Sequence, residues 1–446
     1  MLIPDIIPDQ EPQINVGIIL PEDNITDLTL HIPSNDYQIF LNNQSYNLAK
    51  ESVIILEFIQ GEIHLAFDQQ KISTQAKIEI SPKNKISPSN KSGIKVRSVI
   101  AGRGFHWQKF IEVFLPDTVI VNIIEDSLIL INQMPLEHYV MCVATSEMGA
   151  ECPEALIEAQ TVAARSWLLA NVEQKHRHME MDICNDDCCQ RYQGTTFLTE
   201  QSKAGALNTS GQVIVYDNKI CDARYSKSCG GMMESFGYIW PGNDEDYLQA
   251  IPDSKNMLPE LEKPLSEENN FSNWVNSTPH AFCSSNTVAE KDLKKYLGSV
   301  DEEGEYFRWQ KSVSQKELKE TIYNFAGISV KSINKLEIIS RGMSGRINKL
   351  NIHYLDHNDK ANTFRINSEY DVRRYLSTSF LYSSAITISE QNIKNGIPQD
   401  FLFNGAGWGH GVGLCQIGAL GMSLNNYKSE EILYHYYPGS LLKKIY

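Results

Sequence analysis

One carboxylate falls where a helix is expected to be apolar. Residues 136–147 have the i, i+3, i+4, i+7 spacing of a buried helical face, whose members are Leu136, Tyr139, Val140 and Val143. Glu147 follows Val143 by four residues and lies on the same face. A carboxylate on a buried face loses hydration, which raises its pKa, and a glutamate protonated near neutral pH suits a general acid. The alternative is a glutamate at a helix end that reaches water or pairs with Arg165.

A second helix is predicted directly after the first. Pro153 suits the first helical turn, and small residues mark one face on which another element can approach closely, namely Ala155, Ala159, Ala163 and Ala170. Most of this segment fits an ordinary core helix. Gln160 and Arg165 are its polar exceptions and are candidates for contact with a ligand.

A third segment, residues 405–419, is dense in glycine. It has neither the phosphate-binding Gly-x-x-x-x-Gly-Lys-Ser/Thr pattern nor Gly-x-Gly-x-x-Gly, so nucleotide binding is not predicted. Glycines at alternate positions let a backbone approach a ligand closely. Trp408 offers an apolar face for a sugar ring, and His410 and Gln416 offer hydrogen bonds. The alternative is a tight turn packed under the helices, with Trp408 in the core.

Together these segments resemble the stage II sporulation protein D family, the lytic transglycosylases of sporulation and their relatives, which include the amidase-enhancer proteins. The matching motifs are Ser146-Glu147-Met148, the Ala-Gln-x-Val-Ala-Ala-Arg run from Ala159 to Arg165, the turn Ser228-Cys229-Gly230-Gly231, and the loop from Gly407 to Gly413 followed by Gln416 and Gly418-Ala419. The similarity is strong over about residues 130–250 and 400–440, weaker over 15–130 and 330–400, and absent over 255–330.

The resemblance implies that Glu147 is the catalytic acid/base of a peptidoglycan lytic transglycosylase. Such an enzyme needs one acid/base, because the muramoyl 6-hydroxyl attacks and closes a 1,6-anhydro ring, whereas ordinary glycosidases use two carboxylates. A second carboxylate could come from Glu151, Asp182 or Glu234, but none shares the helical face of Glu147. The residues expected to bind glycan are Gln160, Arg165, Tyr225, Ser228, Gly230, Trp408, His410 and Gln416.

Two other functions remain open at this point. Some relatives enhance a cell-wall amidase, so the chain could bind glycan strands without cutting them and present them to that partner, with the charged segment 255–325 as the docking surface. A zinc-dependent hydrolase built on residues 176–189 is the weaker alternative.

Nine cysteines cannot all pair with one another within the chain. Three of them crowd together after His176 and His178, and the expected ligands of a structural zinc ion are His178, Cys184, Cys188 and Cys189. A disulfide or free thiols are the alternatives. Members of the family often show Cys-x3-His-Cys here, and some bind zinc; Cys188 stands where their histidine would be. Cys229 and Cys415 replace the usual serines of the glycine-rich motifs and are interpreted as small packing residues.

Composition excludes several classes of function. The net charge of −15 argues against nucleic acid and against anionic membrane surfaces as partners. No apolar run has the length of a transmembrane helix. The first nine residues lack the basic and apolar regions of a signal peptide, whereas the resemblance implies an extracytoplasmic location, in the periplasm or cell wall.

Periodicity predicts an α+β fold, with the helical catalytic segment packed on mainly antiparallel sheet and a β-rich N-terminal region. The predicted strands include 14–20, 28–32, 52–59, 63–67, 119–124, 213–216, 223–226 and 347–354, and the predicted helices lie within 134–175 and at 290–297. Four segments are expected: 1–130, β-rich; 131–254, the catalytic core with the cysteines; 255–329, a polar, partly helical insertion; and 330–446, β-rich and completing the core.

Overall fold

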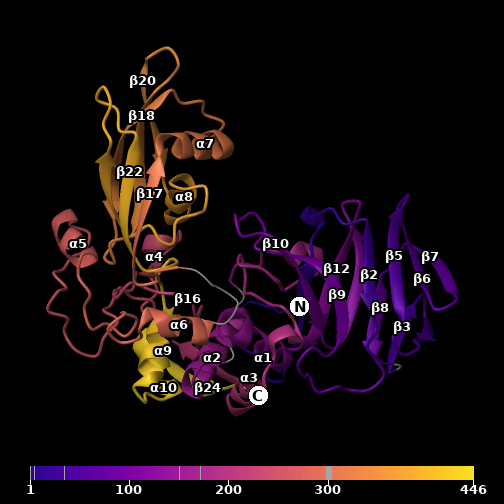
Figure 1. Ribbon diagram of the computed structural model, residues 1–446. Helices are drawn as coiled ribbons and strands as arrows, with labels where there is room; N and C mark the ends of the chain where they lie inside the picture. Colours follow the sequence, from indigo (N-terminus) through magenta and orange to yellow (C-terminus); the bar gives the residue numbers. More distant parts are fainter. Residues whose placement is uncertain (1, 5, 35, 150, 171, 298–303) are drawn as a thin grey trace. The chain divides into compact units, whose positions relative to one another are not determined.

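The computed structural model describes residues 2–4, 6–34, 36–149, 151–170, 172–297 and 304–446 (Figure 1). The chain divides into two compact units: unit 1 comprises residues 1–222 with 442–446, and unit 2 comprises residues 223–441. The segment boundaries expected after residues 130, 254 and 329 all lie inside these units. Among the described residues, no helix is long and apolar enough to cross a membrane.

Two sheets build most of unit 1. The seven-stranded sheet has the order β13-β1-β12-β11-β8-β3-β4, with bounds Ile183–Cys184, Gln13–Ile19, Ser127–Pro135, Thr118–Ile124, Ile78–Pro82, Tyr37–Leu41 and Gln44–Asn47. The six-stranded sheet has the order β10-β9-β2-β5-β6-β7, with bounds Lys109–Leu115, Ile94–Ala101, Asp27–His31, Val53–Ile59, Glu62–Phe67 and Gln70–Thr74. Alternate side chains of the strands from both sheets enter one shared apolar core, so the sequence alternation predicted this β-rich region correctly.

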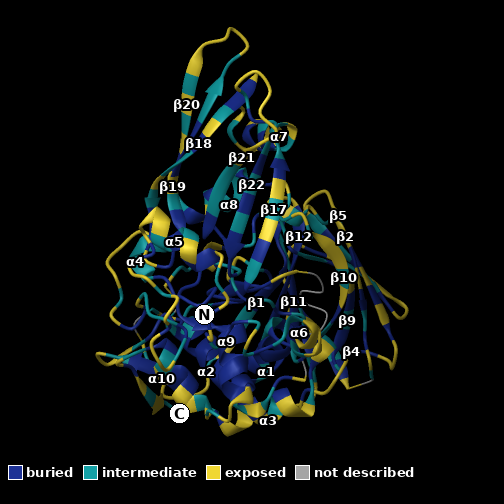
Figure 2. Cartoon of the chain, turned by 60° about the vertical axis from the view of Figure 1, so that its left-hand side comes forward, coloured by how far each residue is buried: buried dark blue, intermediate teal, exposed yellow. Residues whose placement is uncertain are grey.

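Three helices follow β12 and pack on one another: α1 (Leu136–Glu147), α2 (Glu154–Ala170) and α3 (Glu200–Asn208). Most residues of α1 and α2 are buried (Figure 2). Against α2 lies the small sheet β15-β14-β24, with bounds Lys219–Ile220, Gln212–Tyr216 and Leu441–Lys444. Single 3-10 turns occur at Pro21–Asp23, Arg177–Met179 and Thr195–Phe197. Helices set against mainly antiparallel sheet confirm the predicted α+β class.

Unit 2 contains two three-stranded antiparallel sheets (Figure 1). One has the order β17-β22-β21 (Arg308–Ser314, Asp400–Ala406, Ile386–Gln391), and the other has the order β18-β19-β20 (Ser332–Arg341, Ile347–Leu355, Ala361–Ile366). Helices α7 (Gln315–Ala326) and α8 (Glu369–Tyr375) share their apolar core. The remaining elements are α4 (Phe236–Ile239), α5 (Glu268–Val275), α6 (Glu290–Leu297), α9 (Gln416–Leu424), α10 (Ser429–Tyr436) and the parallel pair β16 (Tyr225–Ser226) and β23 (Leu414–Cys415).

Candidate functional site

Glu147 is the last residue of α1. The apolar residues of its predicted stripe are fully buried, and Glu147 itself is half-buried. Its Oε1 accepts a hydrogen bond of 3.0 Å from the backbone N–H of Arg191. The guanidinium of Arg191 binds the Asp187 carboxylate, which also accepts a 3.1 Å hydrogen bond from the Trp107 indole. The carboxylate thus lies where the stripe reaches the edge of the core, next to a loop that supplies a fixed N–H donor.

The alternative carboxylates are placed differently. Asp182 is buried and accepts hydrogen bonds of 2.7 and 2.9 Å from two backbone N–H groups. Glu234 is fully buried, and its Oε2 accepts from the backbone N–H and the hydroxyl of Ser344, at 3.0 and 2.7 Å. Burial raises the pKa of Glu234, and the hydrogen bonds from Ser344 oppose that shift. Glu151 is exposed. The hydrogen bonds of Asp182 and Glu234 therefore favour a structural role for these two carboxylates.

Arg165 lies inside unit 1. Its side chain is fully buried and forms a two-point ion pair with Glu137 of α1, Nε–Oε1 at 3.1 Å and Nη2–Oε2 at 2.6 Å. Glu137 Oε1 also accepts from the Gly211 N–H and the Tyr446 hydroxyl, at 3.1 and 2.6 Å. This pair joins α1, α2 and the C-terminal residue inside unit 1, which favours a structural role for Arg165; its assignment to glycan positioning stays a prediction. Gln160, 1% exposed, is likewise inside the helix packing.

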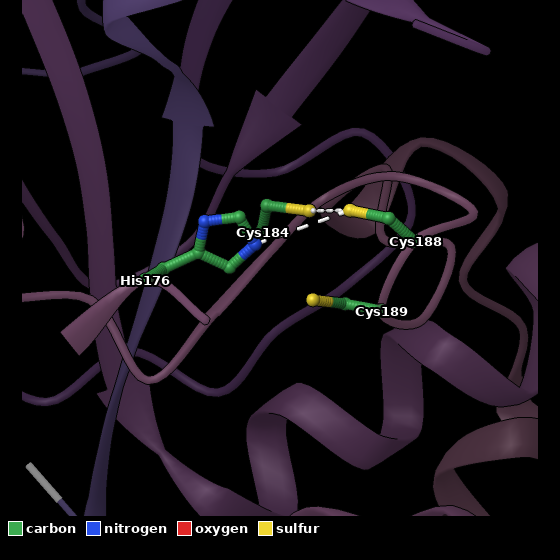
Figure 3. A group of neighbouring side chains, drawn as sticks. All are labelled: His176, Cys184, Cys188 and Cys189. Carbon is green, nitrogen blue, oxygen red and sulfur yellow. Dashed lines mark hydrogen bonds between the residues drawn. The ribbon is translucent and has the colours of Figure 1, made fainter. Parts of the chain in front are cut away.

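The structure brings the three predicted cysteine ligands together, with His176 in place of the predicted His178. His176 and the three cysteines form what we call the Cys/His group: His176, Cys184, Cys188 and Cys189 (Figure 3). Their ligand atoms all lie within 4.8 Å of one another. His178, the histidine predicted from sequence, is exposed on the 3-10 turn Arg177–Met179 and is not part of this group, so the structure favours His176 as the histidine ligand. His176 joins the group because its side chain is buried, and the spacing between histidine and cysteine in the sequence did not reveal which histidine would be buried.

The Cys/His group offers one imidazole and three thiols, a donor set that suits a single tetrahedral ion. Cys188 Sγ lies 3.9 Å from His176 Nε2 and 3.0 Å from Cys184 Sγ, the latter shorter than the roughly 3.8 Å between two thiolates on one zinc ion. For zinc bonds of about 2.3 Å to sulfur and about 2.0 Å to nitrogen, a tetrahedron places sulfur and nitrogen roughly 3.5 Å apart. Hydrogen bonds from Cys184 and Cys189 lower the pKa of Cys188, whereas the pKa of Cys184 and that of Cys189 are raised, so Cys188 is the sulfur that favours a thiolate. The donor set can hold zinc without a ligand from elsewhere.

The Cys/His group and Glu147 are connected through one loop. Cys184, Cys188 and Cys189 precede Arg191, whose N–H holds Glu147, by only a few residues. The start of the loop is fixed by the parallel pairing of β13 with β1. Its middle is fixed by Asp186, which accepts from the backbone N–H of Gly102 at 2.8 Å. Ordering this loop orders the donor to Glu147.

Sequence reasoning missed the aromatic residues near this loop. Phe105 and Trp107 stack with ring centroids 4.2 Å apart on the turn between β9 and β10, and Trp107 binds Asp187 as described above. Their positions in the sequence, between two strands of the N-terminal region, gave no sign that they lie near the loop that contacts Glu147. An aromatic pair of this kind offers a surface on which a sugar ring can pack.

In unit 2 the predicted glycan-binding residues come from two adjoining segments, 225–230 and 408–416. Strand β16 pairs with β23, and Ser228 and Trp408 exchange backbone hydrogen bonds of 2.8 and 3.0 Å. Ser228, Gly230 and Gln416 are buried. Tyr225, Trp408 and His410 are half-buried. Only the second set can therefore touch a ligand in this structure.

The glycines of the 405–419 loop allow its backbone to pack closely against neighbouring backbone segments. Gly407, Gly409, Gly411 and Gly413 all have positive φ, between 71° and 95°. A Cβ at Gly413 would lie 2.1 Å from the Arg224 carbonyl oxygen, and one at Gly407 would lie 2.7 Å from the Ser228 carbonyl oxygen. This supports the interpretation of the loop as a tightly packed turn.

A matched pair of substitutions measures that packing. Gly396→Ala places a Cβ in open space at φ +77°, so it should cost only the backbone strain, ~1–2 kcal/mol. Gly413→Ala has nearly the same φ, +71°, and adds the contact with the Arg224 carbonyl, so we expect ~3 kcal/mol or more. Urea unfolding of the two variants checks this. Equal losses would contradict the close approach.

Aromatic and cationic side chains surround the half-buried residues of unit 2. Trp408 stacks on Tyr306 and Tyr382, with centroids 4.9 and 4.1 Å apart. The His410 ring meets Trp240 edge-on at 4.8 Å. None of these three partners was predicted, because they come from segments without a recognisable motif. They make Trp408 part of an aromatic stack.

His410 is held in its neutral form. Burial lowers its pKa well below the usual value, and the positive charges of Arg224, Arg346 and Arg373 lower it further. Its Nδ1 accepts a 3.0 Å hydrogen bond from the Val412 N–H. The proton of the neutral ring therefore lies on Nε2, which makes His410 a hydrogen-bond donor through that atom.

Comparison with known proteins gives two matched regions. A family model described as Stage II sporulation protein matches residues 125–216, and one described as Domain of unknown function (DUF8618) matches residues 234–413. An uncharacterized protein of Brachyspira hyodysenteriae (strain ATCC 49526 / WA1) is 24% identical over 317 residues, 70% of this chain and 68% of its own length. The protein named Amidase enhancer of Bacillus subtilis (strain 168) is 24% identical over 310 residues, 67% of this chain and 39% of its own length. The first matched region holds α1, α2, Glu147 and the Cys/His group.

Proposed function

We propose that the chain is a peptidoglycan lytic transglycosylase acting outside the cytoplasm, because residues 125–216 match the family model described as Stage II sporulation protein and the chain is similar to an amidase enhancer. It cuts the bond between N-acetylmuramic acid and N-acetylglucosamine in peptide-stripped glycan strands and leaves 1,6-anhydro ends. Glu147 is the acid/base. The observation that carries the proposal is the half-buried Glu147 carboxylate at the end of α1, which accepts a hydrogen bond from the Arg191 backbone N–H.

The chemistry needs only this one carboxyl group. Protonated Glu147 gives its proton to the glycosidic oxygen as the bond to C1 breaks. The resulting carboxylate takes the proton of the 6-hydroxyl, whose oxygen forms the new bond to C1. The C-terminal end of a helix disfavours negative charge, and the N–H of Arg191 stabilises it. These opposing effects suit a group that carries a proton in one step and a charge in the next.

Each unit by itself offers half-buried side chains that could contact sugars. In unit 2 these are Tyr225, Trp408 and His410. In unit 1, Phe105 and Trp107 offer apolar ring faces near the loop that holds Glu147. In unit 2, Ser228, Gly230 and Gln416 are buried beneath the half-buried residues and hold the glycine-rich turn in place.

The Cys/His group is proposed to hold a structural zinc ion. Three sulfurs and one imidazole fill a tetrahedral shell, so no position is open for water or substrate. When bound, zinc supplies folding energy to the loop that leads to Arg191. The chain's own residues perform the chemistry.

Replacing each histidine in turn tests the ligand set. His176→Ala should lose the zinc of the Cys/His group and lower the Tm by roughly 6–12 °C, because losing a structural metal costs ~3 kcal/mol or more. His178→Ala is the matched control, since the exposed His178 lies two residues away, and it should keep both metal and Tm. Metal analysis and a thermal melt check this. Metal loss in His178→Ala alone would restore the original assignment.

A non-catalytic role is the second candidate, favoured by the name of the Bacillus subtilis relative, Amidase enhancer. In that role the chain would bind glycan strands and raise the rate of a cell-wall amidase. Incubating the full chain with peptide-stripped strands, with and without an amidase, separates the two. The enzyme releases soluble fragments alone; an enhancer binds strands, releases nothing alone and accelerates the amidase.

A further inference from the structure

Unit 2 contains a second group of side chains that could hold a metal ion, and the sequence patterns did not predict it. Its members, called the buried cysteine group, are Cys229, Cys283, Cys415 and Asp253. Their ligand atoms lie within 4.8 Å of one another, and each residue is at most 3% exposed. Cys229 and Cys415 were interpreted from sequence as small packing residues, and that interpretation omits Cys283 and Asp253. We propose that the buried cysteine group binds a second structural zinc ion.

The sulfur positions match one tetrahedral ion. Cys229 Sγ and Cys283 Sγ lie 3.7 Å apart. Two thiolates bound to zinc at about 2.3 Å in a tetrahedron are roughly 3.8 Å apart. A disulfide would require about 2.05 Å. The separation therefore corresponds to two ligands of one ion.

The surroundings of Cys415 suit a thiolate. Its Sγ accepts hydrogen bonds from the backbone N–H groups of Cys229, at 3.2 Å, and Gly418, at 3.3 Å. Cys415 also caps the N-terminus of α9, where the helix dipole favours negative charge. A neutral thiol is a weak acceptor, whereas a metal-bound thiolate uses such N–H donors to distribute its charge.

Asp253 is oriented as a fourth ligand. Its Oδ1 accepts a 2.7 Å hydrogen bond from the Tyr436 hydroxyl, and its Oδ2 accepts a 2.9 Å bond from the Cys283 N–H. Each oxygen keeps a second lone pair, so either can bind a metal. Second-shell donors of this kind fix the direction of a ligating carboxylate. A divalent cation would offset the cost of enclosing this acidic residue with three thiols.

The ion would join four parts of the chain. Cys229 lies on the turn before Gly230, and Cys415 begins α9 after the glycine-rich loop. Cys283 belongs to the segment 255–325, whose sequence does not resemble the family. The site therefore assigns this segment a role: it supplies one ligand that holds both glycine-rich motifs together. Binding releases the three thiol protons to solvent.

Metal content of the full chain tests the proposal independently of lytic activity. We expect two zinc ions per chain purified without chelator under reducing conditions. His176→Ala and Cys283→Ser should each keep one, and the double variant should keep none. Cys142→Ala is the control, because Cys142 is a buried thiol outside both groups, and it should keep two.

Two results would overturn the second site. One is a zinc content that Cys283→Ser leaves unchanged. The other is a count of free thiols, in the denatured and unreduced chain, that is two short of the nine cysteines, which would mean a disulfide. If Cys283→Ser does not fold, cobalt titration of His176→Ala decides: thiolate-to-cobalt absorption with tetrahedral d–d bands supports the site, and their absence overturns it. Failure here leaves the role of Glu147 untouched.

Discussion

Glu147→Gln should lower the rate of glycan cleavage by about 10²–10⁴ while the chain stays folded. The amide keeps the size of the side chain and can still accept the hydrogen bond from the Arg191 N–H. It has no proton to donate to the glycosidic oxygen and cannot take one from the 6-hydroxyl. Affinity for glycan strands should change little. The measurement is the release of soluble fragments, with a thermal melt to confirm folding.

Glu151→Gln is the matched control for that loss. Glu151 is exposed, follows Glu147 by four residues and was itself a candidate second carboxylate. Its variant should cleave strands at the wild-type rate. Full turnover by Glu147→Gln would remove Glu147 from the mechanism. Comparable losses in both variants would mean that two carboxylates act and that the reaction is hydrolytic.

Arg165→Met should destabilise unit 1 by ~3–5 kcal/mol, because it leaves the buried Glu137 carboxylate without its cation. Glu137→Gln should reduce stability by a comparable amount, since it leaves the fully buried Arg165 guanidinium without its carboxylate partner. The double variant should recover part of the loss, because removing both charges removes the unpaired one. Urea unfolding measures all three. The folded fraction of each variant should retain wild-type turnover.

An exposed ion pair in the same unit provides the comparison. Lys203 and Glu200 on α3 lie 3.3 Å apart, with the Glu200 side chain 87% exposed. Glu200→Ala should change stability by less than ~1 kcal/mol. If Arg165→Met kept wild-type stability and lost glycan turnover, Arg165 would have to act on the substrate.

Local patterns predicted much of the fold because they depend on neighbours in sequence. The alternation in residues 28–32 and 63–67 matches β2 and β6 to within one residue, and α6 has the predicted bounds, Glu290–Leu297. The 3.6-residue stripe placed Glu147 on the buried helical face, and the structure puts it half-buried at the end of that face. The two helices predicted within 134–175 are α1, which ends at Glu147, and α2, which begins at Glu154 directly after Pro153.

Local sequence patterns could not predict contacts between segments that are distant in the sequence. Arg165 pairs with Glu137 because α1 and α2 cross at that point, and no spacing encodes a crossing. His176 is a metal-group member and His178 is not, because a 3-10 turn directs one inward and the other to solvent. Cys229 and Cys415 are 186 residues apart, and only the pairing of β16 with β23 brings them together. Side-chain direction and long-range pairing decided these cases.

The most direct test of lytic transglycosylase activity is mass spectrometry of the products formed from peptide-stripped glycan strands in isotope-labelled water by the chain alone. We predict muramic acid ends that are one water lighter than reducing ends and that carry no label, because the 6-hydroxyl and not water attacks C1. Unlabelled 1,6-anhydro ends that disappear with Glu147→Gln would establish the account. Labelled reducing ends would instead identify a hydrolase with a second carboxylate, and strand binding without any product would identify an enhancer; either result would contradict it.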